Sequence, residues 1–300
     1  MAVADIIQAR RPRGGRVRRP EAARGYALLS PAMIVMVVAL AAPMLLLALY
    51  SFWTQAGLSL DTHFTLGRYA EALGRGSWRD LFWRSLAISS AVTLATVLLA
   101  YPMAYFVAFH ARAKFAWLIL LTIPFWTSYL LRVFAWKVIL GYNGVINSGL
   151  MDLGLIRQPL EFLLYNPFAV VVTLAHAWAA FAILPIYVSL EKIDRSLLDA
   201  AADLGDGPLR RFLRVTLPLS LPGVIGAAVL IFVPTTGDYV TPTLVGGPGG
   251  VMIANVIEVE FDRIGDWPMG AALAIASMAA VGIVTLLTVQ AVRLAASRVR

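Results

Sequence analysis

The chain of 300 residues contains no cysteine and only three histidines. Without cysteine it forms no disulfide, thiolate metal site or iron–sulfur cluster. The histidines, His63, His110 and His176, lie in separate segments without HExxH spacing, so we expect no metal site. None of the three lysines follows a glycine, which excludes a GxxxxGK[ST] phosphate loop. We therefore expect no cofactor in this chain.

Charged residues are also scarce, at 14% against 60% hydrophobic residues, and the mean hydropathy is +0.77. This composition excludes a soluble globular enzyme. Six uncharged runs are each long enough to cross the ~30 Å hydrocarbon layer as a helix. They are residues 26–53, 85–109, 115–131, 162–190, 215–237 and 267–292. A transmembrane β-barrel would instead alternate apolar and polar residues. The sequence thus predicts an all-α membrane protein with six transmembrane helices.

The distribution of positive charge predicts the orientation of these helices under the positive-inside rule. With the N-terminus inside, the inside segments carry seventeen Lys/Arg and the outside segments six. The inside segments are residues 1–25, 110–114, 191–214 and 293–300, and the outside ones are 54–84, 140–161 and 246–266. Both termini are therefore expected in the cytoplasm. No loop is long enough for a separate domain, so we expect one membrane domain over residues 26–292 and a cytoplasmic tail over 293–300.

The basic leader, residues 1–25, has seven arginines between Arg10 and Arg24. Such a run can be a nucleic-acid arm or the start of a secretory signal. The 28-residue apolar run that follows exceeds the apolar part of a typical signal peptide. We therefore expect a retained first span with its arginines on membrane lipid headgroups, and no nucleic acid.

Four ionisable residues, Arg132, Lys137, Asp238 and Glu258, fall at or near membrane depth, where a charge costs roughly 2.5–3.5 kcal/mol. Arg132 and Lys137 lie toward the outer end of the third run, and we interpret them as interfacial anchors with extended side chains. Asp238 follows 23 uncharged residues in a stretch broken by prolines and a glycine. It can line a cavity or cap a helix at the outer end.

The outside segments are expected to contain only short elements. Trp78, Phe82 and Trp83 are the interfacial aromatics of a short outside helix in residues 54–84. The apolar stretch 145–155 predicts a partly exposed interfacial helix. The Gly-rich segment that contains Glu258 is expected to lie outside or to be re-entrant.

The inside segment that begins at residue 191 has the pattern of a helix-turn-helix. Asp194 is a candidate N-cap, and apolar residues then recur at helical spacing until Gly205. Pro208 can begin a second, basic helix that runs to Leu217 and Pro218. The small side chains at 200–202 suit close approach by another protein. The alternative is an amphipathic helix that contacts only lipid.

The same segment resembles the EAA-x3-G-x9-I-x-LP signature of permease subunits of bacterial ABC importers. The positions that match are Asp199, Ala200, Ala201, Gly205, Val215, Leu217 and Pro218. Asp199 and Val215 depart mildly from the signature and keep a carboxylate and a β-branched side chain. The resemblance implies the type I ABC importer permease fold in the inner membrane of a bacterium. It also implies that residues 191–218, the 191–218 loop, couple this chain to a cytoplasmic ATPase.

The rest of the chain resembles the spermidine/putrescine class of these permeases. The resemblance rests on "PFWTSYLLRVFAWKVIL" from Pro124, "GVIN", "LPIYVSLEKID", "FVPTTGDYVTPTLVGGP" and "DWPMGAALA". It implies a polyamine path with acids and aromatics, for which the candidates are Asp238, Tyr239, Trp126 and Tyr129. Related permeases for opines, phosphonates, amino-acid derivatives and ferric iron share much of the pattern.

The resemblance further implies a set of partners. Two cytoplasmic ATPase subunits would bind ATP and Mg, a soluble or lipid-anchored binding protein would deliver the solute, and a related permease would pair with this chain, a homodimer being the alternative. The chain itself would transport by alternating access and would not be an enzyme. An ion-coupled secondary transporter is a further alternative, although we find no convincing internal repeat.

Overall fold

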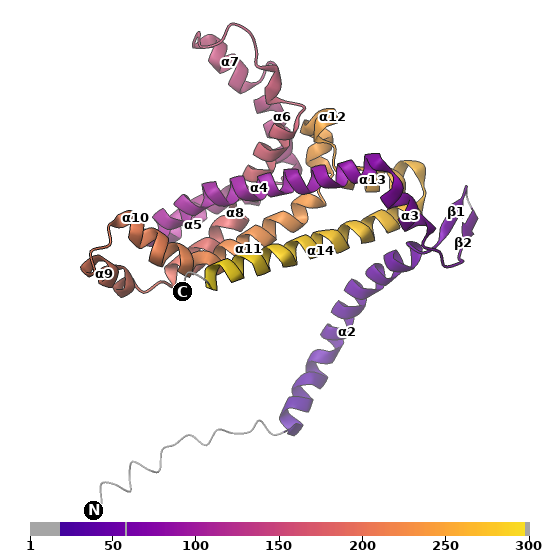
Figure 1. Cartoon of the computed structure of the whole chain (residues 1–300), viewed down its shortest axis with the longest axis horizontal. Helices are drawn as coiled ribbons and strands as arrows, with labels where there is room; N and C mark the ends of the chain where they lie inside the picture. Colours follow the sequence, from indigo (N-terminus) through magenta and orange to yellow (C-terminus); the bar gives the residue numbers. More distant parts are fainter. Residues whose placement is uncertain (1–18, 58, 298–300) are drawn as a thin grey trace, which may run out of the picture. The chain divides into compact units, whose positions relative to one another are not determined.

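A computed structural model describes residues 19–57 and 59–297, and most of them are helical (Figure 1). The chain divides into two units, residues 1–49 and 50–300. Most of the predicted leader, together with the last three residues of the predicted tail, lies outside the described residues.

The first described element, α2 (Arg19–Tyr50), corresponds to the first predicted span. Its apolar stretch, Gly25–Tyr50, has 26 residues. At 1.5 Å per residue this stretch is about 39 Å long, enough to cross the hydrocarbon layer. Large apolar side chains such as Leu28 and Leu40 are exposed along it, as suits a helix surrounded by lipid or by another chain.

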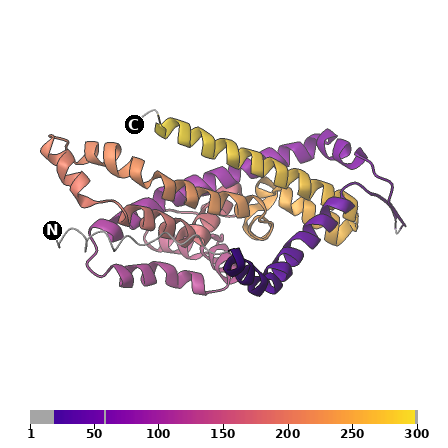
Figure 2. The same ribbon diagram turned by 90° about the horizontal axis from the view of Figure 1, so that it is seen from below.

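Three long helices form the core of the second unit: α4 (Gly76–Phe109), α8 (Pro167–Glu191) and α11 (Leu217–Thr236). Their facing side chains are fully buried and include Val92, Ala104, Leu174, Ile183 and Ile231. A fourth long helix, α14 (Trp267–Ser297), lies beside α11 (Figures 1 and 2). Phe232 of α11 and Val281 of α14 belong to one buried apolar cluster. The predicted second, fourth, fifth and sixth spans are thus long helices.

The predicted third span, residues 115–131, is wrong as a single straight helix. It consists of α5 (Lys114–Thr122) and a 3₁₀ turn, η1 (Ile123–Trp126), after which α6 (Tyr129–Leu140) leaves at a bend of 86°. Thr127 and Ser128 have extended backbone angles, which end the helical hydrogen-bond ladder. Apolar composition predicted the length of this run but carried no signal for the bend.

The first outside segment differs from the single short helix that we expected. It contains a hairpin of β1 (Thr54–Ala56) and β2 (Ser59–Asp61), in which Thr54 pairs with Asp61. A short helix, α3 (Gly67–Gly74), follows. Trp78, Phe82 and Trp83 lie in α4 itself, which begins nine residues before the predicted span.

Two further outside segments are short helices in loops. After α6 come α7 (Val145–Asp152) and η2 (Glu161–Leu163), so the predicted interfacial helix is shorter than expected. After α11 the chain forms a pair of helices bent by 113°, which agrees with a re-entrant or outside segment. The elements of this pair are η4 (Pro242–Gly246), α12 (Gly247–Gly250), α13 (Ile253–Val259) and η5 (Glu260–Ile264).

Two ion pairs join loops that lie at opposite ends of the long helices (Figure 1). At one end, Lys114 pairs with Glu191 at 2.9 Å, which joins the two inside segments 110–114 and 191–214. At the other end, Arg68 pairs with Asp266 at 3.2 Å, which joins two outside segments. Five described helices are long and apolar enough to span a membrane, or up to seven spans if each bent pair counts as one.

Candidate functional site

The bend between α5 and α6 places Tyr129 opposite the turn that follows α11. The Tyr129 hydroxyl donates a hydrogen bond to Oδ2 of Asp238. Oδ1 of Asp238 accepts from the backbone N–H groups of Val240, at 2.9 Å, and Thr241, at 3.3 Å. Asp238 therefore caps the helical segment that follows it, which is one of the two roles open from the sequence.

Asp238 also lines a cavity of about 350 Å³, so the other role holds as well. The cavity lies between α6, α8 and the end of α11, and four of its nine lining residues are aromatic. The lining residues are Tyr129, Arg132, Ala177, Trp178, Phe181, Pro234, Gly237, Asp238 and Tyr239. Three of the four predicted path residues, Asp238, Tyr239 and Tyr129, thus come together in one cavity.

Trp126, the fourth predicted path residue, is not among the residues that line this cavity. Its side chain is 81% exposed at the end of η1. The cavity wall uses Trp178 and Phe181 instead, which lie one turn apart on α8 and form an aromatic pair with ring centroids 5.1 Å apart. Within a uniformly apolar run, the sequence held no signal that distinguished these two rings.

Arg132 also lines the cavity, whereas the sequence predicted an interfacial anchor. Its Nη1 donates to the backbone oxygen of Ala177 at 3.0 Å, and its guanidinium lies 4.8 Å from the ring centre of Phe125. The half-buried side chain is thus held against α8 and an aromatic face. The signal that could have placed it here was its charge at membrane depth.

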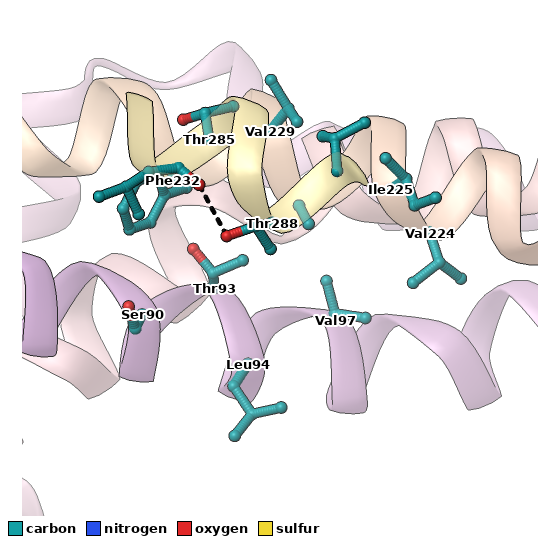
Figure 3. A pocket seen from close by; sticks show the side chains of 13 residues that line it. Ser90, Thr93, Leu94, Val97, Val224, Ile225, Val229, Phe232, Thr285 and Thr288 are labelled. Carbon is teal, nitrogen blue, oxygen red and sulfur yellow. Dashed lines mark hydrogen bonds between the residues drawn. The ribbon is translucent and has the colours of Figure 1, made fainter. Parts of the chain in front are cut away.

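A second cavity, of about 330 Å³, lies between α4, α11 and α14 (Figure 3). Its thirteen lining residues are apolar or carry hydroxyl groups, and one of these hydroxyls, that of Thr288, donates to the backbone oxygen of Val284 at 2.8 Å. Such a wall offers no charge to pair with an ionic solute. The Asp238 cavity is therefore the better candidate for a solute site.

The 191–218 loop has the predicted helix-turn-helix. Oδ1 of Asp194 accepts from the N–H of Ser196 at 3.0 Å and caps α9 (Arg195–Asp203), and this hydrogen bond lowers the pKa of Asp194. Gly205 has φ +86°, in the left-handed region that ends many helices. Gly207 then caps α10 (Pro208–Arg211), which begins with the predicted proline.

The second helix of the loop was predicted to end at Leu217 and Pro218, but it does not end there. It continues through η3 (Phe212–Thr216), a π-helical turn, into α11. In this turn the N–H of Leu217 bonds to the oxygen of Phe212, five residues back. Pro218 has no N–H to donate, and the wider turn before it accommodates that missing bond within a continuous helix.

The loop presents much of its surface to solvent. Asp199, Ala200 and Gly205 are exposed, while Ala201 is buried against the chain's own residues and Val215, Leu217 and Pro218 are half-buried. Leu204 is 88% exposed. Together with the exposed side chains of Leu197, Leu209 and Leu213, it makes the surface of the loop partly apolar, which suits contact with another protein.

The chain belongs to the family described as "Binding-protein-dependent transport system inner membrane component", which it matches over residues 22–300. It is therefore a multi-pass transport component of the inner membrane that works with a solute-binding protein, and not an enzyme.

Two relatives define the part of the family to which the chain is similar. It is 37% identical over 232 residues to the "Spermidine/putrescine transport system permease protein PotB" of Escherichia coli (strain K12), covering 77% of this chain and 84% of the relative. It is 35% identical over 235 residues to PotB of Haemophilus influenzae, covering 78% and 82%. The resemblance to the spermidine/putrescine class of permeases is confirmed.

The fold is that of ABC importer permeases, as predicted. The structure superposes on a chain of "a bacterial ABC transporter involved in the import of the acidic polysaccharide alginate" with a TM-score of 0.65 at 16% identity, over 89% of this chain and 94% of that one.

Proposed function

We propose that this chain forms the polyamine path of an ATP-driven importer. The observation that carries the proposal is the Asp238 carboxylate in a cavity walled by Tyr129, Trp178 and Tyr239. A carboxylate pairs with an ammonium group, and aromatic faces attract the same cation. The relatives named for spermidine and putrescine support this solute class.

In this proposal, Asp238 and Tyr239 contact the ammonium group of the solute. The hydrogen bond from Tyr129 to Asp238 breaks, so that the carboxylate can pair with the ammonium group. Trp126 contacts the solute only in another conformation of the bend after η1. A path of this kind needs alternating access, in which one state of the transporter opens the cavity outward and the other inward.

The energy would come from two cytoplasmic ATPase subunits, which bind ATP and Mg. They would contact the 191–218 loop at the exposed positions Asp199, Ala200 and Gly205. A second, related permease would complete the path as a heterodimer with this chain. A binding protein in the periplasm, soluble or anchored to lipid, would deliver the solute.

The test is the ATPase activity of the purified complex in lipid with its binding protein, measured against putrescine, spermidine, an opine, an amino acid and a phosphonate. Stimulation by a polyamine is expected. Stimulation by another solute alone would overturn the polyamine assignment, and uptake that persists without ATP on an ion gradient would overturn the ATP-driven mechanism.

A second candidate solute carries a carboxylate beside its amine, as an opine or an amino-acid derivative does. Arg132 and Trp178 favour it, because Nε of Arg132 and Nε1 of Trp178 are buried N–H donors that lack a hydrogen-bond partner among the described residues. Such donors suit an anionic or carbonyl oxygen. Stimulation by the opine or the amino acid, and not by putrescine, would favour this candidate.

A further inference from the structure

Three aromatic side chains connect the 191–218 loop to α4, and we call them the aromatic joint: Tyr101, Tyr105 and Phe212. Phe212 is the first residue of η3 and follows α10 directly. Its ring meets that of Tyr101 edge-on at 5.7 Å between centroids, and that of Tyr105 at 6.1 Å. Edge-to-face pairs at such distances are attractive beyond the area they bury.

A hydrogen bond links Tyr101 to Ser220, which lies in α11, after the π-turn that contains Phe212. The Tyr101 hydroxyl lies 2.8 Å from Oγ of Ser220, which is fully buried. The Ser220 hydroxyl also lies 3.0 Å from the backbone oxygen of Leu217, to which it donates. Because a hydroxyl has one proton, Tyr101 is the donor to Ser220.

The backbone is weakened on both sides of these contacts. The π-turn η3 begins at Phe212, and Pro218 and Pro222 flank Ser220 in α11. In α4, Pro102 follows Tyr101 directly. Each proline removes a helical hydrogen bond, and π-turns are frequent at functional sites. The side-chain contacts therefore join two helices at positions where both can bend.

The covalent chain alone does not link the 191–218 loop to α4. The loop continues directly into α8 on one side and into α11 on the other, so these two helices follow any displacement of the loop. α4 ends at Phe109, more than eighty residues earlier in the sequence. A displacement of the loop can reach α4 only through packed side chains or hydrogen bonds.

We propose that the aromatic joint transmits the displacement of the 191–218 loop to α4, so that α4 moves with α11 when the ATPase subunits close. This proposal rests on the proposed function, in which ATPase subunits act on the loop. It assigns Phe212, Tyr101 and Ser220 as positioning residues for transport, since they lie apart from the Asp238 cavity.

The test is the amount of solute taken up per ATP hydrolysed, measured with the full complex in proteoliposomes. Phe212→Ala is expected to lower this ratio about fivefold or more, within the usual range of coupling between sites, while the complex keeps hydrolysing ATP. Phe212→Trp restores an aromatic ring and is expected to recover most of the ratio. A variant that only loosened the fold would lower uptake and ATP hydrolysis together.

Phe106→Ala is the matched control, because Phe106 is an aromatic residue in the same last turns of α4. Its ring contacts His110 and Trp117 and not Phe212. The control is expected to couple normally. Equal ratios in Phe212→Ala and Phe106→Ala would overturn the proposal.

A second pair of variants tests the joint without removing a ring, so it decides the matter if Phe212→Ala does not accumulate. Tyr101→Phe and Ser220→Ala each delete one hydroxyl of the buried hydrogen bond. Each is expected to lower the ratio, and the double variant is expected to lower it no further than Ser220→Ala alone, which already removes the bond to Tyr101 together with the bond from Ser220 to Leu217. Normal ratios in both single variants, or additive losses, would overturn the proposal.

Ala200→Trp separates this failure from failure of the proposed function. A large ring at this exposed position blocks docking of the loop on another protein. If Ala200→Trp uncouples transport and the joint variants do not, the joint is wrong and the docking role stands. If Ala200→Trp couples normally, the docking role that underlies both proposals is wrong.

Discussion

Tyr129 and Asp238 are 109 positions apart in the sequence and share a hydrogen bond that holds the start of α6 to the turn after α11. Oγ1 of Thr241 lies 2.5 Å from the same phenol oxygen. Because the phenol proton goes to the carboxylate, the Thr241 hydroxyl is the donor to Tyr129. A cation that pairs with Oδ2 of Asp238 therefore has to share it with Tyr129 or displace it.

Replacing Asp238 with asparagine is expected to remove the negative charge and keep the helix cap. The amide oxygen can still accept from the N–H groups of Val240 and Thr241. Loss of one charged hydrogen bond corresponds to about a tenfold increase in the polyamine concentration that half-stimulates the ATPase. The titration of ATPase activity with putrescine measures this shift.

Asp238→Ala serves as the comparison, because it removes the cap as well as the charge. We expect it to lower the thermal stability of the purified complex more than Asp238→Asn does. If Asp238→Asn leaves the putrescine titration unchanged, Asp238 is only a helix cap.

Replacing Tyr129 with phenylalanine is expected to strengthen the response to a polyamine. The variant frees Oδ2 of Asp238 from a competing donor while it keeps the aromatic face in the cavity wall. A hydrogen bond worth ~1 kcal/mol corresponds to a titration midpoint about fivefold lower. A midpoint that rises instead would mean that the Tyr129 hydroxyl itself binds the solute.

Gly205 is expected to be replaceable by asparagine but not by alanine. Open space surrounds the position where its Cβ would lie, so only the backbone angle opposes a side chain. At φ +86° an alanine costs about 1–2 kcal/mol, whereas asparagine tolerates this region better. We expect Gly205→Ala to reduce uptake per ATP and Gly205→Asn to retain most of it. Equal ratios in the two variants would show that the turn angle does not matter for coupling.

The sequence predicted the parts of this structure that depend on composition and on local turn chemistry. The long apolar runs became helices, and the capping residue Asp194 and the turn at Gly205 were both identified correctly. The family resemblance named Tyr129 and Asp238 only as separate candidates for the path; their hydrogen bond was not predicted, because no local rule relates residues so far apart.

The features that the sequence did not reveal depend on how the helices pack. The chain bends between Trp126 and Tyr129, and only Tyr129 lines the cavity; apolarity alone does not distinguish a bent span from a straight one. Ala201 was expected to form part of a docking surface and is buried instead. Its neighbour Ala200 is exposed, so Ala200 is the better position at which to test docking.

At Gly223, α11 lies against the backbone of α8. A Cβ there would lie 2.5 Å from both the backbone oxygen of Pro185 and Cβ of Ser189, so the two helices would have to separate. Overpacking of this kind typically costs about 1–3 kcal/mol. We therefore expect Gly223→Ala to lower the Tm of the purified complex by several degrees.

Gly226→Ala, three residues further along α11, is the control, because its Cβ meets only open space and alanine favours a helix. An unchanged Tm in Gly223→Ala would mean that α8 and α11 can separate at little cost, and the two helices would then not move as one body with the 191–218 loop.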